Sequence, residues 1–337
     1  MSAVPYVVGQ WVRGTRFYGR RLELESLLSP GRAQWIAGLR RIGKTSLLRQ
    51  LERIAADTAR DRPVVPLFWD LQGVDGEEEL AFSFADALLD AGEVLKGHGV
   101  ADAAIADADL PASCARLLRG LESAGADLWL LCDEADEAIE FSAAASGRLQ
   151  NIWRAVLDTP GGRLVIASSL RLCDRAADDP RIRDLVAGFA PPIWCGALAD
   201  DEARALVGQT QLPLDARPKL APVTAESIAA ECGNHPMLLQ ILGRRHHELG
   251  DLGEALHQVA ADRMLPHLFA VDFDLLTGFE RELLWKLADR EPSREMDSEP
   301  EGAVHRLKAL GLVHRGAEGW RIPNRFFATW LRHLRHS

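Results

Sequence analysis

A glycine-rich segment near the N-terminus carries the clearest chemical pattern in this sequence. Gly38-Leu39-Arg40-Arg41-Ile42-Gly43-Lys44-Thr45 matches G-x-x-x-x-G-K-[ST] at every fixed position. The glycines let the main chain curl until successive N–H groups point at one phosphate, and a helix starting there adds partial positive charge. Lys44 would reach the terminal phosphates, and the Thr45 hydroxyl would bind Mg²⁺. The segment, extended to Ser46, therefore predicts a polyphosphate-binding loop.

A second pattern is the apolar run Leu128–Cys132, which ends in two adjacent carboxylates, Asp133 and Glu134. Ligands of parallel α/β sheets bind at the carboxyl ends of the strands. There, Asp133 would hold Mg²⁺, and Glu134 would orient and deprotonate an attacking water. Such acidic strand ends are common by themselves. Following a phosphate loop, this pair predicts nucleotide hydrolysis rather than binding alone.

A third apolar run, Leu164–Ser168, is followed by a second serine and then by Arg171. Ser168 could sense a terminal phosphate, and Arg171 could stabilise negative charge in a transition state. A surface arginine that follows a strand explains Arg171 equally well. Arg181 and Arg183 are further candidates, although solvated helix positions explain them better.

The elements that would position these residues alternate between strands and helices in the first 195 residues. Between the strand-length apolar runs lie amphipathic helical patterns, and this alternation is typical of a parallel α/β sheet covered on both faces. The predicted strands are 34–37, 64–71, 128–132, 164–168 and 192–195. The predicted helices are 44–56, 78–95, 112–123 and 139–157. The fold class is therefore a three-layer α/β domain with a mainly parallel sheet.

The rest of the chain indicates two smaller domains. Four helical patterns without intervening strands follow Cys195, at 200–208, 224–232, 237–249 and 252–264, and predict a small helical domain. After residue 268 come a helix at 279–290, a polar loop at 291–302, a helix at 303–310, a two-stranded turn region at 311–323 and a last helix at 326–334. This order is the outline of a winged helix-turn-helix. The Ala- and Asp-rich stretch 101–110 predicts an exposed loop or helix.

Taken together, these patterns resemble the STAND class of P-loop ATPases within the wider AAA+ group. Two more segments carry the resemblance. Residues 17–24, Phe-Tyr-Gly-Arg-Arg-Leu-Glu-Leu, are similar to the leading F-x-G-R-x-x-E-L box of that class, and residues 232–236, Cys-Gly-Asn-His-Pro, are similar to its Gly/Pro motif. The resemblance implies that Phe17, Gly19 and Arg20 contact the base and ribose, and that Pro236 packs near adenine. It also implies that the ligand is ATP with Mg²⁺. The choice of ATP over GTP rests on this resemblance, since no guanine-specific N-K-x-D pattern is present.

The resemblance orders the chain into four parts. Residues 1–20 would be a nucleotide-contacting segment, 21–197 the ATPase core, 198–266 a helical lid and 267–337 the winged-helix domain. One departure is that a polar loop stands where the winged domain should have its second helix. That departure counts against DNA reading.

The amino-acid composition limits which binding partners, metal sites and cell compartments are expected. The formal net charge is −10 over 337 residues, which disfavours broad non-specific coating of DNA. The five cysteines form no C-x-x-C pair, so a zinc site or disulfide framework is not indicated, and a reducing cytoplasm is the expected compartment. The sequence shows neither a signal peptide nor an apolar run that could cross a membrane.

Three functions remain open at this stage. The first is a slow, regulatory ATPase that switches conformation, forms homo-oligomers when ATP binds and is read by a separate effector or sensor protein. The second is an AAA+-type ATPase acting on DNA, resembling a replication initiator or a transposition factor. Seven basic residues against one acid in 303–337 support it. The third is a scaffold with a vestigial site, which the intact Lys44, Thr45, Asp133 and Glu134 argue against.

Overall fold

The computed structural model describes residues 4–58, 61–100, 109–289 and 292–336. These residues form two compact units. Leu22–Ala37 and Lys44–Ile193 make up an α/β unit, and Met1–Arg21, Gly38–Gly43 and Trp194–Ser337 make up a second, mainly helical unit. We call these two parts the α/β unit and the helical unit. The boundaries predicted at residues 20, 197 and 266 stay predictions.

The α/β unit is built on a sheet whose strand order is β2-β3-β4-β1-β5. Parallel pairing joins β2 to β3, β3 to β4 and β4 to β1, as the apolar runs predict. The strands are β1 (Ala33–Ala37), β2 (Val64–Asp70), β3 (Asp127–Asp133), β4 (Arg163–Ser168) and β5 (Ile193–Trp194). Because the strands run in parallel, Asp70 and Asp133 lie in register at neighbouring carboxyl ends.

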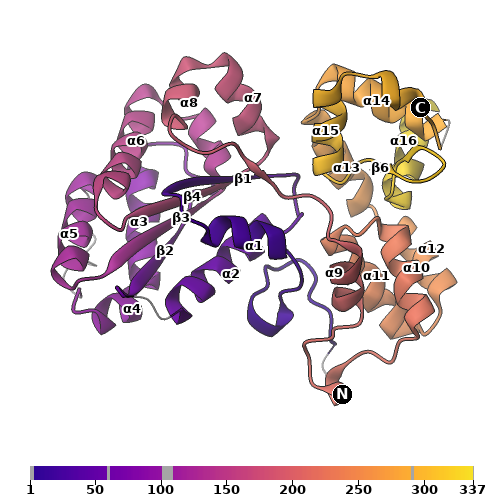
Figure 1. Ribbon diagram of the computed structural model, residues 1–337, viewed down its shortest axis with the longest axis horizontal. Helices are drawn as coiled ribbons and strands as arrows, with labels where there is room; N and C mark the ends of the chain where they lie inside the picture. Colours follow the sequence, from indigo (N-terminus) through magenta and orange to yellow (C-terminus); the bar gives the residue numbers. More distant parts are fainter. Residues whose placement is uncertain (1–3, 59–60, 101–108, 290–291, 337) are drawn as a thin grey trace. The chain divides into compact units, whose positions relative to one another are not determined.

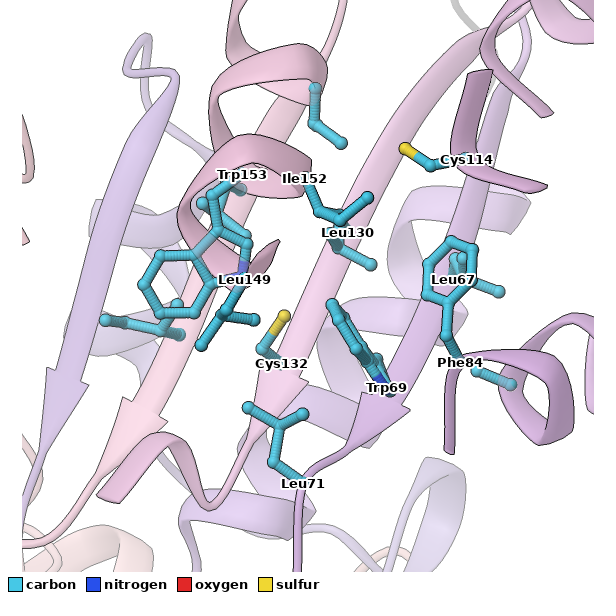
Figure 2. Packing of buried hydrophobic residues seen from close by; sticks show 14 of the residues in the cluster. Leu67, Trp69, Leu71, Phe84, Cys114, Leu130, Cys132, Leu149, Ile152 and Trp153 are labelled. Atoms are coloured by element: carbon cyan, nitrogen blue, oxygen red, sulfur yellow. The ribbon is translucent and has the colours of Figure 1, made fainter. Parts of the chain in front are cut away.

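Both faces of this sheet are covered by helices, which confirms the three-layer prediction (Figure 1). Helices α3 (Glu77–Asp90), α5 (Leu110–Ser123) and α6 (Ala143–Asp158) cover one face, where alternate strand residues form the main core. Trp69 of β2 packs edge-on against Phe84 of α3 there, with ring centroids 4.9 Å apart (Figure 2). Helix α2 (Lys44–Asp57) packs against the other face, where the Arg49 guanidinium lies 3.4 Å from the centre of the Phe68 ring.

Some helix boundaries differ from the sequence expectations. The helix predicted over 78–95 is two helices, α3 and α4 (Gly92–Gly97), because the chain turns at Ala91. The helix predicted over 139–157 begins at Ala143 instead, since the Ser142 hydroxyl caps it by accepting a hydrogen bond from the Ala145 N–H. Two short helices follow β4, α7 (Leu170–Asp178) and α8 (Pro180–Leu185). Helix α7 was not predicted, whereas α8 contains Arg181 and Arg183, for which helix positions were expected. Residues 101–108 of the predicted Ala- and Asp-rich stretch lie outside the described residues.

The helical unit has a lid-like part that follows β5. Its helices are α9 (Asp200–Val207), α10 (Pro222–Cys232), α11 (Pro236–Leu249) and α12 (Leu252–Ala260). Prolines open α10 and α11, at a position where a missing N–H costs nothing. The helix predicted over 252–264 ends earlier than expected, at Ala260, and a separate helix α13 (Met264–Asp274) follows.

The C-terminal part of the helical unit contains the predicted hairpin between helices. Its elements are α14 (Gly278–Asp289), the 3-10 turn Glu295–Ser298, α15 (Glu301–Ala309), β6 (His314–Arg315), β7 (Trp320–Arg321) and α16 (Arg325–His336). Aromatic side chains join α13 to α16, with ring centroids 5.4 Å apart for Phe269 and Phe327 and 5.6 Å apart for Phe273 and Trp330. Only the short 3-10 turn occupies the segment where the second helix of a winged domain would lie.

The structure also bears on two sequence expectations, those about membrane spans and those about the cysteines. Within the described residues, no helix is long and apolar enough to span a bilayer. All five cysteines are free thiols, and all but Cys173 are buried. Burial raises the pKa of Cys114 to about 12, so its thiol stays protonated at neutral pH.

Candidate nucleotide site

The first part of the phosphate loop, Gly38–Gly43, lies in the helical unit. A Cβ atom on Gly38 would come within 2.5 Å of the Cys195 carbonyl oxygen, so only glycine fits there. Gly43 has φ +100°, which favours glycine for conformational reasons, since nothing lies within 4 Å of its Cβ position. Arg41 also adopts a left-handed conformation, with φ 55°. The loop therefore has the curled main chain that its sequence predicts.

Two more segments of the predicted site meet this loop inside the helical unit. The buried Arg20 guanidinium donates a hydrogen bond to the Ile42 carbonyl at 2.8 Å. Burial and the nearby Arg20 charge lower the pKa of His235 to about 4, so this imidazole is neutral at pH 7. His235 directly precedes Pro236, the first residue of α11. The structure thus brings Arg20, the loop and the Gly/Pro motif together.

Phe17 and Gly19 are placed by contacts with the lid. The Phe17 carbonyl accepts a hydrogen bond from Gln211 Nε2 at 2.8 Å. Gly19 lies against Glu202, whose side chain would be 2.7 Å from a Cβ added at Gly19. Phe17 itself is buried. These contacts fix Phe17 and Gly19 on the lid, while their contact with a base stays a prediction.

Lys44 and Thr45 start α2 in the α/β unit and face the end of β3. The Thr45 hydroxyl donates a hydrogen bond to the Asp133 carboxylate, and the Lys44 charge lies close to both Asp133 and Glu134. Lys44 is 6% exposed and Asp133 is 2% exposed, so both charges are largely desolvated. Burial raises the pKa of Asp133, which Thr45 and Lys44 partly oppose. This arrangement joins an ammonium, a hydroxyl and a carboxylate, as the two motifs predict.

Glu134 is held in an unusual backbone conformation directly after β3. Its φ is 50° and its ψ is 43°, a left-handed geometry that costs a non-glycine residue on the order of 1–3 kcal/mol. Its N–H donates to Asp133 Oδ1 at 3.1 Å. Burial raises the pKa of the Glu134 carboxyl, and the nearby Lys44 charge partly opposes this rise. A carboxyl with a raised pKa beside a lysine suits a general base.

The sequence analysis missed Asp70 as a neighbour of these groups. Asp70 ends β2 in register with Asp133, and its charge contributes to the raised pKa values of Asp133 and Glu134. The available signal was the same one used for β3, an apolar strand ending in an acid. Asp70 therefore belongs to the electrostatic surroundings of Asp133 and Glu134.

Asp136 also differs from expectation, because its position after the acidic pair predicts a solvated helix start, and this prediction is wrong. It is buried and accepts hydrogen bonds from the Ser169 N–H, the Ser169 hydroxyl at 2.8 Å and the Leu172 N–H at 3.2 Å. Ser168 is fully buried beside it, and its hydroxyl accepts from Trp35 Nε1 at 2.8 Å. Asp136 thus ties the segment after β3 to the end of β4.

We expect Asp136→Asn to destabilise the α/β unit by about 1–3 kcal/mol, because an amide donor would face N–H and O–H donors in a buried place. Urea unfolding followed by circular dichroism measures this change. Asp178→Asn, at an exposed position of α7, is the matched control. Equal stability of the Asp136 variant and the wild type would contradict the anchoring role.

Arg171 lies at the start of α7 with its side chain 46% exposed, and it forms an ion pair with Glu140 at 2.7 Å. Arg181 pairs with Asp179 at 2.9 Å, and Arg183 donates to main-chain carbonyls of α7. Exposed pairs of this kind contribute little to stability. A role of Arg171 toward phosphate stays a prediction.

The helical unit also contains a cavity beside the phosphate loop. Its volume is about 300 Å³, and Arg41 of the loop and Met237 of α11 are among its lining residues. Next to it, the buried Asp272 carboxylate of α13 accepts a hydrogen bond from the Arg40 N–H at 2.9 Å. The loop is therefore bonded directly to α13, a contact that the sequence did not indicate. Its signal would have been an acidic residue flanked by the apolar residues Val271 and Phe273.

Comparison with solved structures shows the fold. The chain is similar to the Walker-type ATPase PABY2304 of Pyrococcus abyssi, with a TM-score of 0.67 and 15% identity over 97% of this chain and 99% of that one. It is also similar to the ORC2 protein of Aeropyrum pernix in ADPNP–ADP complexes, with a TM-score of 0.52 and 14% identity over 98% and 97%. No known family model and no curated protein matches the sequence.

This chain has a P-loop NTPase fold. The sheet order, the lid and the C-terminal hairpin region agree with the predicted α/β class. The similarity covers almost the full length of both archaeal proteins, so it includes the helical unit as well as the sheet. The AAA+ part of the expected resemblance is supported at the level of fold, whereas the STAND assignment stays a prediction.

Proposed function

We propose that this protein is an ATP-binding and ATP-hydrolysing switch of the STAND type, whose nucleotide state controls its assembly and its interaction with a partner. The phosphates would lie on Gly38–Thr45, with Lys44 facing the terminal groups and Glu134 activating water. The cavity lined by Arg41 and Met237 would take the base and ribose, next to Pro236. Turnover would be slow, as suits a regulatory ATPase.

The side chains present fit a magnesium ion. Mg²⁺ prefers oxygen ligands, and a threonine hydroxyl and a carboxylate lie in direct contact at Thr45 and Asp133. These two residues would hold the ion with the phosphates. When bound, it would neutralise developing charge on the transferred phosphoryl group.

One observation carries the switch proposal, the hydrogen bond from the Arg40 N–H to Asp272. It places a buried negative charge of the C-terminal helices against the loop that would receive the negative triphosphate. Two anions competing for the same region of main chain repel each other. Binding of ATP would therefore weaken the hold of α13 on the loop, and α13 would report the nucleotide state.

We test this proposal by size-exclusion chromatography with light scattering, with ADP and with a non-hydrolysable ATP analogue. The wild type should gain mass with the analogue. Asp272→Asn keeps an acceptor oxygen but loses the charge, so it should assemble at roughly fivefold lower analogue concentration, the lower end of typical coupling between sites. Asp274→Asn, exposed on the same helix, is the matched control and should behave as the wild type.

A mass that stays the same with and without the analogue in all three proteins would contradict the switch. An Asp272→Asn variant that assembles like the wild type would instead remove α13 from the mechanism. In that case nucleotide binding and assembly would be coupled by another contact.

Action on DNA is less well supported by the C-terminal surface. Of the seven basic residues in 303–337, four form ion pairs within the chain. These pairs are Arg306–Glu280, Arg315–Asp297, Arg325–Glu231 and Arg335–Asp289. A cation that is already paired gains less from a phosphate contact. A salt-titrated mobility-shift assay distinguishes this alternative from the switch.

A further inference from the structure

Helix α3 has large apolar side chains on two opposite sides. Toward the sheet, Leu80, Phe84 and Leu88 are buried, and Phe84 packs on Trp69 (Figure 2). Away from the sheet, Phe82 is 59% exposed and Leu89 is 64% exposed. These two residues are seven apart, or about two helical turns, so they lie on one stripe.

This outward stripe is unusual for a helix on the surface of a sheet. Helices α5 and α6 cover the same face, and their outward positions include the exposed charges Arg119, Glu122 and Arg154. A helix on the surface of a sheet normally turns its polar side to solvent, so large apolar side chains on that side are unusual. Single exposed apolar residues need no explanation, whereas exposed apolar surface rimmed by polar residues is typical of an interaction site.

Acidic side chains border the stripe. Glu79, Asp86 and Asp90 run along one flank of Phe82 and Leu89, and Glu78 lies on the other. None of these four carboxylates forms an ion pair with any residue that the structure describes, in contrast to Glu77, which pairs with Arg148 at 2.5 Å. Unbalanced negative charge around an apolar stripe attracts a positively charged partner and steers its approach. We call Glu78, Glu79, Phe82, Asp86, Leu89 and Asp90 the α3 outer face.

We propose that the α3 outer face binds a basic amphipathic helix of a separate protein. The apolar side of that helix would pack on Phe82 and Leu89, and its lysines or arginines would lie along the carboxylates. A second copy of this chain is a poor occupant, because its net charge is −10 and most basic residues of its C-terminal stretch are already paired. The proposal does not depend on nucleotide binding.

Fluorescence anisotropy with the full chain tests this proposal. The probe is a labelled synthetic amphipathic helix with leucines on one side and lysines on the other, and its counterpart has glutamate in place of lysine. The lysine peptide should bind the wild type, and the glutamate peptide should bind at least about tenfold more weakly. Phe82→Ser with Leu89→Ser should weaken the lysine peptide about tenfold, and so should Glu79→Gln with Asp86→Asn and Asp90→Asn.

Leu214→Ser is the matched control, since Leu214 is an apolar side chain 81% exposed in the helical unit. It should bind the lysine peptide as the wild type does, and ATP turnover should be unchanged in every variant. Binding of the lysine peptide within about twofold of the wild type by both α3 variants would overturn the proposal. So would a wild-type dimer in light scattering that the Phe82 and Leu89 changes dissolve, because a second copy would then be the occupant.

Discussion

Lys44→Ala is expected to lower ATP turnover by at least about 10²-fold, because it removes the one ammonium that the structure places against Asp133 and Glu134 at the start of α2. Lys44 is largely buried, so no solvent ion replaces its charge efficiently. The loss should include binding as well as chemistry, since the same charge attracts the triphosphate before and during the reaction. Isothermal titration with the non-hydrolysable analogue separates the two effects.

The fold should survive this change. Without Lys44, the pKa of Asp133 should rise further, and its protonated form would stay hydrogen-bonded to Thr45. Lys96→Ala is the matched control, because Lys96 is exposed and pairs only with Glu93 among the described residues. Turnover of Lys44→Ala at the wild-type rate, with an unchanged circular dichroism spectrum, would refute the assignment of the phosphate loop.

Glu134→Gln should keep ATP binding and slow hydrolysis by about 10²–10⁴-fold, the usual contribution of a general base. The amide has nearly the same shape as the carboxyl and still orients a water, but it cannot accept the proton. A single-turnover experiment should show bound ATP persisting in the variant. If the switch proposal holds, the ATP-bound assembly should accumulate as well.

Glu137→Gln is the matched control for this experiment. Glu137 follows three residues later, and its carboxylate accepts a long hydrogen bond of 3.4 Å from the Gly73 N–H. Normal hydrolysis by Glu134→Gln would place the general base elsewhere, and the register of the strands makes Asp70 the next candidate. That result would leave the phosphate loop itself unaffected.

The fold was predictable where local chemistry decides it. Strands β2, β3 and β4 are apolar on both sides of the pleat, so covered parallel strands follow directly from the sequence. The helix break at Ala91 was not predictable, because no proline precedes it and the glycine that follows is tolerated within helices. Helix α7 was missed because it is short and directly follows the apolar run of β4, so that only the cap at Ser169 separates the two elements.

The candidate site also has some residues that the sequence predicts and others that it does not. The loop and the acidic pair are contiguous motifs, and their spacing identifies them without any structure. Asp136, Asp70 and Asp272 act across long sequence separations, through contacts with Ser169, Asp133 and Arg40. Such contacts depend on the packing of distant elements, which a single sequence does not specify.

The left-handed backbone at Glu134 sets stability against chemistry at one position. Glycine would relieve the conformational strain there but would also remove the carboxylate. Such a variant could gain stability and lose hydrolysis at the same time. Selection for stability alone would favour glycine at this position. We therefore expect the Glu134 carboxylate to be retained for its chemistry at the expense of local stability.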